Sequence, residues 1–406
     1  MITVKGGVTV PEGFFANGLK AGIKKSGKKD LALIYSQNPA VAAAAFTTNV
    51  FKSSHINVSA KHVRNRYHRA VIVNAGNANC ANGKPGDRDA LRMCKSVADE
   101  LDFDEREVLA ASTGIIGRKL PIEKIENNVP ALVGGLSKRG GDDFAESILT
   151  TDTVKKEMAV KIRLGSKTIS IGGACKGVGM IYPVMKTQRH ATLLCFVTTD
   201  AAISKKMLEE AVSEGIEDSF NMVSVDGDMS TNDTCYVLAN ALAGNRPIKS
   251  KGSDYRKFTD ALRFLLAELA KMVARDGEGA TKFVEITVAG ARCREDAVRI
   301  ARKISTSSLL KCCIYGQDPN WGRVVAAAGS SGVDFNPDKV DLILGGVGVL
   351  RNGGLVKGYD PKKTKKLFEK KDIYIKMDLK SGRSEATAWT CDFSKEYVAI
   401  NSEYST

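Results

Sequence analysis

The chain has 406 residues, 43% of them apolar, and its 60 Lys and Arg outnumber its 46 Asp and Glu, which leaves a net charge of +14. This length suffices for two or three domains with substantial cores. No stretch approaches the roughly 18 uninterrupted apolar residues of a transmembrane helix, and the N-terminus lacks the apolar core of a secretory signal. We therefore expect a globular cytoplasmic protein with no membrane partner.

Strand-like and helix-like patterns alternate along the whole chain. In chain order they predict a strand at Ala70–Val73, a helix at Arg88–Leu101, strands at Val108–Ala111, Lys167–Ile171 and Thr192–Thr199, helices at Lys205–Ser219 and Ser253–Arg275, a strand at Phe283–Val288, a helix at Arg294–Ile304, and strands at Leu342–Leu344 and Ile373–Leu379. The first three strands are expected to run into glycine-rich loops. This interleaving predicts an α/β or α+β fold.

The positive charge is concentrated in two lysine-rich runs, Lys24–Lys29 and Pro361–Lys371. A protein that binds nucleic acid usually interleaves such charge with aromatic residues, and neither run does so. We expect solvated lysines and no nucleic-acid partner, with a basic nucleic-acid-binding protein as the non-enzyme alternative. The nine scattered cysteines, without a C-x-x-C pair, indicate reduced thiols that act as small apolar fillers.

Several familiar catalytic and metal-binding patterns are absent from the sequence. The possible calcium loop that begins at Asp226 has Thr231 where a glycine is required, and the dinucleotide fingerprint is broken at Arg351. No H-x₃-H pair and no G-x-S-x-G elbow accompanies the histidines, which are His55, His62, His68 and His190. We expect no metal and no cofactor. A catalytic base would be a lysine, a carboxylate or an α-amine rather than a histidine.

Nine short blocks carry a more specific signal. They are Asn74–Gly83, Ser112–Gly117, Thr150–Thr153, Gly172–Pro183, Ala191–Ile203, Ser219–Thr234, Asp276–Lys282, Tyr315–Val324 and Ile400–Thr406. Each block alone is weak evidence, but together and in this order they resemble the ornithine acetyltransferase family, also called glutamate N-acetyltransferases. The resemblance extends from one end of the chain to the other.

The resemblance implies a fold and a processing event. The expected fold is a layered α-β-β-α sandwich, shared with self-cleaving aminopeptidases, with a smaller α/β domain. Members of the family act in arginine biosynthesis, and their precursor cuts itself before a threonine, which here is the Ala191–Thr192 bond. The expected products are an N-terminal fragment of residues 1–191 and a C-terminal fragment of residues 192–406. The family also implies a heterotetramer with two copies of each fragment.

The implied reaction transfers acetyl from N2-acetylornithine to glutamate through an acetyl ester of Thr192. A threonine hydroxyl needs a nearby base, and the α-amine that cleavage exposes has a pKa of about 8 in model peptides. Thr113 and Gly114 match the pair of the family that stabilises the oxyanion, for which a hydroxyl and a backbone N–H are suitable donors. Acetyl-CoA is a candidate co-substrate.

The substrate-binding positions also follow from the resemblance. They are Thr150, Lys176, Thr192, Glu278, Asn401 and Thr406. A lysine suits the carboxylate of an amino acid, and Glu278 suits the ammonium group of ornithine. In the block Thr150–Thr153 a neighbouring threonine is an alternative to Thr150.

The sequence departs from the family at Lys186–His190, which stand as extra residues before the Ala191–Thr192 junction. They put the efficiency of self-cleavage in question. Two other enzyme classes stay open at this point. One is a self-cleaving aminopeptidase or amidase of related fold, and the other is a cysteine hydrolase that uses Cys80 or Cys175.

Overall fold

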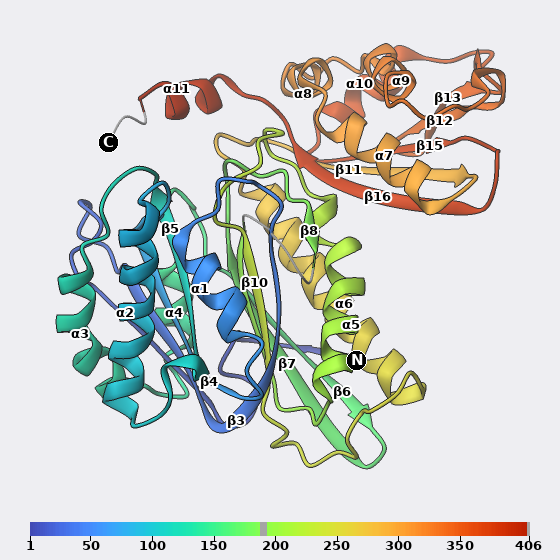
Figure 1. Ribbon diagram of the computed structural model, residues 1–406. Coiled ribbons are helices and arrows are strands. Elements are labelled where there is room, and N and C mark those ends of the chain that lie inside the picture. The colour runs from blue at the N-terminus through green and yellow to red at the C-terminus, as the bar shows by residue number, and fades with distance from the viewer. Residues whose placement is uncertain (187–192, 404–406) are drawn as a thin grey trace. The chain divides into compact units, whose positions relative to one another are not determined.

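The computed structural model describes residues 1–186 and 193–403, which form two compact units (Figure 1). The first unit contains Met1–Gly177, Pro183–Asn221 and Met229–Leu269, and the second contains Val178–Tyr182, Met222–Asp228 and Ala270–Thr406. These units are divisions by packing, whereas the predicted fragments 1–191 and 192–406 are divisions of the covalent chain. The first unit therefore contains parts of both predicted fragments.

The first unit is organised around the long strand β3 (Leu31–Thr47). Its first half pairs with β2 (Phe14–Leu19) and β4 (His68–Asn77), and β4 pairs in parallel with β5 (Val108–Ile115). Its second half pairs with β10 (Thr234–Ala239) and with the short β8 (Met185–Lys186). Beyond β10 the sheet continues through β9 (Leu194–Thr199), β7 (Lys167–Lys176), β6 (Lys156–Leu164) and β1 (Ile2–Val4).

The two halves of this sheet stack face to face. The hydroxyl of Tyr236 on β10 donates to the carbonyl oxygen of Ala110 on β5 at 2.7 Å, although two strands separate β10 and β5 in the sheet order. Alternate residues of β3, β4 and β5 point into a core between the layers, where Phe144 and Phe196 meet edge to face at 5.2 Å. The other residues of these strands face the helices.

Helices cover the outer face of each layer (Figure 1). On the β2–β5 side they are α2 (Gly83–Leu101) and α3 (Ile122–Gly134). Helix α1 (Ser54–His62) lies beside β5, where Ser59 Oγ donates to the carbonyl oxygen of Ala110, and it contributes Ile56 to the core between the layers. On the other side the helices are α5 (Lys205–Glu217) and α6 (Ser253–Arg275), while α4 (Gly141–Ser147) contributes Phe144 to the core between the layers. The predicted α-β-β-α sandwich is confirmed.

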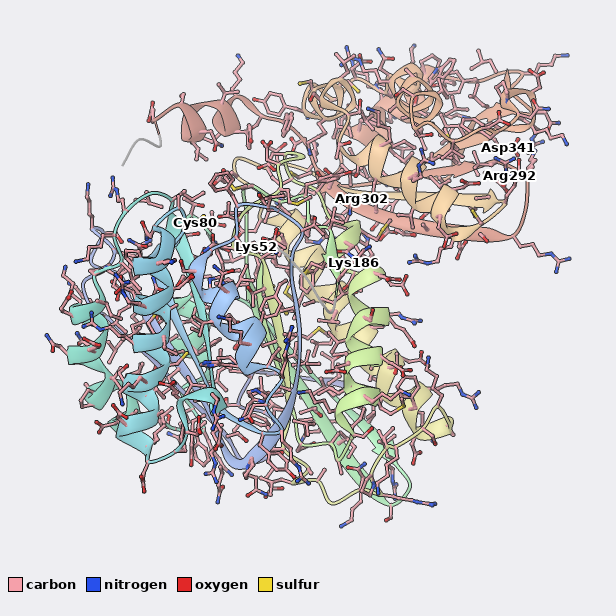
Figure 2. The ribbon with its side chains drawn as sticks, viewed as in Figure 1. Lys52, Cys80, Lys186, Arg292, Arg302 and Asp341 are labelled. Carbon is pink, nitrogen blue, oxygen red and sulfur yellow. The ribbon has the colours of Figure 1, made fainter. Side chains whose placement is uncertain are left out.

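The second unit has a six-stranded sheet in the order β14 (Gly354–Leu355), β13 (Val347–Arg351), β12 (Asp341–Leu344), β15 (Asp372–Asp378), β11 (Phe283–Ala291) and β16 (Ser384–Cys391). Its helices are α7 (Arg294–Ser305), α8 (Ser308–Tyr315), α9 (Trp321–Gly329), α10 (Pro361–Phe368) and α11 (Lys395–Glu403). Figure 2 labels Arg302 on α7, whose guanidinium carbon lies 4.0 Å from the centre of the Tyr182 ring. The predicted smaller α/β domain is thus present.

Short 3₁₀ helices complete the described elements, at Glu105–Glu107, Phe220–Met222 and Pro337–Lys339. Among the helices of residues 1–186 and 193–403, none has the length and apolar character needed to cross a membrane.

The glycine-rich motifs are the main difference from the predicted elements. They were expected to be loops, but β4 continues to Asn77, β5 to Ile115 and β7 to Lys176. Small residues are required here by close packing rather than by turns. A Cβ on Gly172 of β7 would lie 2.1 Å from the carbonyl oxygen of Gly7, and tertiary packing of this kind leaves no periodic signal in the sequence.

Candidate active site

Three strands of one layer begin or end at the level of Leu194, two residues after the predicted nucleophile in the sequence. Leu194, the first residue of β9, is paired with Lys176, the last residue of β7, and with Thr234, the first residue of β10. The carbonyl oxygen of Leu193 accepts the backbone N–H of Thr234 at 2.5 Å. The chain that follows Thr192 is therefore held between β7 and β10. Ala191 and Thr192 lie outside the described residues. Of the predicted extra segment Lys186–His190, Lys186 ends β8 and residues 187–190 also lie outside the described residues.

Thr113 and Gly114, the predicted oxyanion pair, lie near the end of β5 in the other layer. The Asn232 side chain holds this strand end, because its Nδ2 donates to the carbonyl oxygens of Ser112 and Ala78, each at 2.7 Å. Gly114 has φ +133°, and a Cβ at this position would lie 2.3 Å from the carbonyl carbon of Gly76. Only glycine meets both requirements, so the Thr-Gly sequence has a structural reason.

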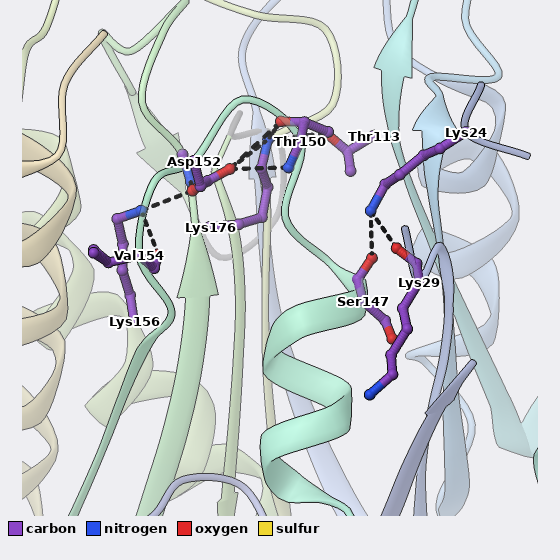
Figure 3. Close-up of polar contacts among 10 residues, drawn as sticks. Lys24, Lys29, Thr113, Ser147, Thr150, Asp152, Val154, Lys156 and Lys176 are labelled. Atoms are coloured by element: carbon purple, nitrogen blue, oxygen red, sulfur yellow. Dashed lines mark hydrogen bonds and ion pairs between the residues drawn. The ribbon is translucent and has the colours of Figure 1, made fainter. Parts of the chain in front are cut away.

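Lys176 joins the two layers at this point. Its Nζ donates to Thr150 Oγ1 at 2.7 Å and to Thr113 Oγ1 at 3.3 Å (Figure 3). Thr150 lies in the connection between α4 and β6, so three segments far apart in the sequence meet here. The structure therefore brings together three residues that the family resemblance implied as site residues. Of the threonines in Thr150–Thr153, Thr150 is the one whose hydroxyl accepts from Lys176.

Asp152, which was not among the predicted site residues, lies at the centre of this cluster. Its carboxylate accepts Lys156 Nζ at 2.8 Å, the Gly177 N–H at 2.8 Å and the Thr150 N–H at 3.0 Å. Burial alone would raise the pKa of Asp152, but the charges of Lys176 and Lys156 outweigh it and hold that pKa well below its usual range. Asp152 is therefore a buried anion between two cations.

Sequence reasoning missed Asp152 because an aspartate in a polar stretch is usually exposed. The only available signal was its place within the Thr150–Thr153 block. For Lys156 no feature of the sequence indicated burial, because nothing distinguishes it from its exposed neighbour Lys155. Its side chain is nevertheless 0% exposed.

Lys24 corrects another expectation, that the run Lys24–Lys29 is a solvated surface. Its Nζ donates to the carbonyl oxygens of Lys29 at 2.5 Å and Ser147 at 3.2 Å (Figure 3). Burial, opposed by Asp30 and assisted by the charge of Lys176, lowers the pKa of Lys24 to about 8. The prediction fails here because the aliphatic stem of Lys24 packs beside the end of β4. A Cβ on Gly76 of that strand would lie 3.0 Å from Lys24 Cγ.

Three further predicted substrate-binding residues, Glu278, Asn401 and Thr406, belong to the second unit. Asn401 Nδ2 on α11 donates to Glu278 Oε2 at 3.0 Å, so these two predicted residues are in direct contact. Gly179 makes room for the Glu278 carboxylate, since a Cβ at Gly179 would lie 2.3 Å from Oε2. The Asp226 carboxylate accepts the N–H groups of Met180 and Ile181 at 2.6 and 2.9 Å and fixes this turn. Thr406 lies outside the described residues.

The two cysteines that the sequence left open as nucleophiles, Cys80 and Cys175, are both buried. Cys175 is fully buried with its Sγ 3.7 Å from the carbonyl oxygen of Leu269, and burial raises the pKa of its thiol. Cys80, labelled in Figure 2, is also buried, with its Sγ 3.8 Å from the carbonyl oxygen of Phe51. Since the thiolate is the reactive species, the raised pKa disfavours Cys175 as a nucleophile, and the buried Cys80 presents no exposed thiol to a substrate.

Comparison with known proteins identifies the family. Residues 15–406 match the model of the ArgJ family. The chain belongs to the ArgJ family. It is 46% identical over 404 residues to the arginine biosynthesis bifunctional protein ArgJ of Dehalococcoides mccartyi, with 99% of this chain and 98% of the relative covered. It is 44% identical over 416 residues to the glutamate N-acetyltransferase of Methanocaldococcus jannaschii, with 100% of each covered.

A solved structure agrees with this assignment. The crystal structure of the ArgJ protein of Bacillus halodurans matches with a TM-score of 0.50 and 38% identity, and covers 52% of this chain and 98% of that one. The predicted family and the enzymatic nature of the chain are therefore confirmed. Membership of the ArgJ family favours the enzyme over the nucleic-acid-binding alternative, and arginine biosynthesis is its metabolic setting.

Proposed function

We propose that this ArgJ family member transfers acetyl from N2-acetylornithine to glutamate. The observation that carries the proposal is the contact of Lys176 with both Thr113 and Thr150, opposite the start of β9. This arrangement brings a cation and two hydroxyl groups close to the start of β9, two residues after Thr192 in the sequence. It supports an acyl-transfer site because the tetrahedral intermediate of acyl transfer develops a negative oxygen that such donors stabilise.

The proposed reaction begins with self-cleavage between Ala191 and Thr192. The Thr192 hydroxyl attacks the carbonyl carbon of Ala191, the C–N bond breaks, and water hydrolyses the resulting ester. The exposed α-amine of Thr192 then takes the proton of its own hydroxyl, which attacks the acetyl carbonyl of N2-acetylornithine. Ornithine leaves with that proton. The amine of glutamate next attacks the acetyl ester and regenerates the free hydroxyl. Thr113 and Gly114 would stabilise the oxyanion at each of these steps.

The proposed substrate contacts follow the chemistry of an amino acid. Lys176 would bind the α-carboxylate, Thr150 would assist it, and Glu278 would bind the side-chain ammonium of ornithine. Asn401 and Thr406 complete the proposed set. The assembly would contain two copies of fragment 1–191 and two of fragment 192–406. A solved relative whose whole chain corresponds to 52% of this one is consistent with such a division.

A second substrate is suggested by the names of the relatives. Several relatives, among them the Dehalococcoides mccartyi protein, are called bifunctional. We propose that acetyl-CoA can also acetylate Thr192, which would let the enzyme form acetylglutamate without acetylornithine. An assay with acetyl-CoA and glutamate alone tests this activity.

Cleavage and transfer can be tested together. Denaturing electrophoresis of the wild type is expected to show two fragments. N-terminal sequencing of the larger fragment, residues 192–406, should begin at Thr192, while Thr192→Ala stays uncut and inactive. Ornithine release should require glutamate. Release at the same rate with water as acceptor would instead identify an amidase, and a single uncut, fully active wild-type chain would refute the threonine mechanism.

A further inference from the structure

Lys176 is positioned in an unexpected way relative to its nearest anion. Its Nζ lies 3.9 Å from Asp152 Oδ2, beyond hydrogen-bond distance, although both groups are charged and largely buried. It lies instead 2.7 Å from the Thr150 hydroxyl and 3.3 Å from the Thr113 hydroxyl. A buried ammonium this close to a carboxylate normally forms a direct hydrogen bond with it, so other interactions of the two groups must prevent that bond here.

Lys156 and the backbone provide the explanation. Asp152 Oδ1 accepts from Lys156 Nζ and from the Gly177 N–H, each at 2.8 Å, and Oδ2 accepts the Thr150 N–H at 3.0 Å (Figure 3). The Lys156 and Asp152 side chains are both 0% exposed. The carboxylate is thus occupied by other donors, and it holds Lys176 nearby by charge while the ammonium donates to the Thr150 and Thr113 hydroxyls.

A hydroxyl that accepts from an ammonium must direct its own hydrogen elsewhere. The adjacent positive charge also polarises that O–H bond and makes it a stronger donor, as in other charge-assisted hydrogen bonds. Thr113 is in this situation, and it is the hydroxyl that our proposed function assigns to the oxyanion.

We propose that Lys176 is a positioning residue of the oxyanion hole, which orients and polarises the Thr113 hydroxyl and is itself held by the buried pair Asp152 and Lys156. The inference rests on the proposed function and extends it. It gives Lys176 a role that does not depend on a bound amino acid, in addition to binding a substrate carboxylate.

Self-cleavage separates the two roles. It passes through an oxyanion but needs no acetylornithine or glutamate. If Lys176 only binds a substrate carboxylate, Lys176→Met should raise KM and leave cleavage of the precursor unchanged. If Lys176 acts on Thr113, the same variant should slow cleavage by about tenfold, which is less than the loss of a whole oxyanion donor causes.

The decisive experiment is a double-mutant cycle on the cleavage rate of the full chain, followed by electrophoresis. Thr113→Val is nearly isosteric but lacks the hydroxyl, and it should slow cleavage by roughly 100-fold. Adding Lys176→Met to Thr113→Val should then have little further effect, because the group through which the lysine acts is gone. Independent, multiplicative effects of the two substitutions would overturn the proposal.

Lys155→Met is the matched control, since Lys155 precedes Lys156 and pairs with Asp142 at the surface. It should cleave at the wild-type rate. Thermal unfolding of each uncut precursor establishes that it is folded, and Lys176→Arg, which retains the charge, should recover part of the cleavage rate. A wild type that neither cleaves nor transfers acetyl would overturn the proposed function together with this inference. A wild type that does both, beside a Lys176→Met chain that cleaves normally, would overturn the inference alone.

Discussion

The two groups of predicted substrate-binding residues differ in how the fold holds them. In the first unit, Thr150 and Lys176 lie in a cluster whose central carboxylate is fully buried and accepts four hydrogen bonds. In the second unit, Glu278 and Asn401 share one hydrogen bond at an exposed position near the end of the chain. The comparison teaches that the first group is preorganised by packing, whereas the second depends on a short, solvated helix.

This difference predicts unequal effects on stability. Asp152→Asn leaves the charges of Lys156 and Lys176 without their buried counterion, so we expect the free energy of unfolding to fall by about 3–5 kcal/mol. Asp142→Asn, which removes the partner of the exposed Lys155, should cost about 0–1 kcal/mol. Urea unfolding monitored by circular dichroism measures both values. Equal losses in the two variants would show that the buried cluster has no special importance for stability.

The next largest effect is expected on catalysis within the first group. Thr113→Ala should slow precursor cleavage and lower kcat by an order of magnitude or more, because both reactions form an oxyanion at Thr192. Electrophoresis of the precursor and steady-state kinetics of the cleaved enzyme provide the two readouts. Normal values in both would place the oxyanion hole elsewhere.

The second group should influence substrate affinity alone. Deletion of residues 401–406 removes Asn401, the partner of Glu278, and should raise KM for acetylornithine and glutamate by about tenfold, the equivalent of one hydrogen bond to a charged group. Folding and self-cleavage should survive, since the segment is short and Thr192 and Thr113 remain. Unchanged kinetics in the truncated enzyme would remove Asn401 and Thr406 from the site.

The last expected effect is on the pH dependence of stability. His55 is fully buried between the Ser53 and Thr234 hydroxyls, and burial lowers its pKa to about 3. The unfolded chain binds a proton near pH 6.5 and the folded chain does not, so stability should fall as pH decreases from 6.5 toward 3. His55 alone should contribute about 1.4 kcal/mol for each pH unit.

His55→Asn tests this sign. The variant lacks the titrating group, so its stability deficit relative to the wild type should shrink between pH 6.5 and pH 5. Urea unfolding at several pH values measures the difference. A deficit that stays constant, or grows, over this range would contradict a neutral buried His55.

Some features of the protein were determined by the sequence alone. The apolar stripe of α6 predicted its limits, Ser253–Arg275, and Phe258, Leu262 and Leu266 are indeed buried. The positions of α5, α7, β11 and β15 were also predicted to within a few residues. The motif blocks, taken together, indicated the family to which the chain belongs. All these signals are local patterns or short words, which a linear sequence retains.

Only the tertiary structure decided the rest. The alanine-rich second half of β3 is a strand because β10 pairs with it, despite the preference of alanine for helices. Lys156 and Asp152 are buried beside Lys176, although their neighbours Lys155 and Val154 are exposed. Thr113 meets Lys176 because the strands that carry them belong to opposite layers of one folded sheet. The physical reason is the same in each case: strand order and stacking bring together residues that are far apart in the chain, and no local period records which of them will meet.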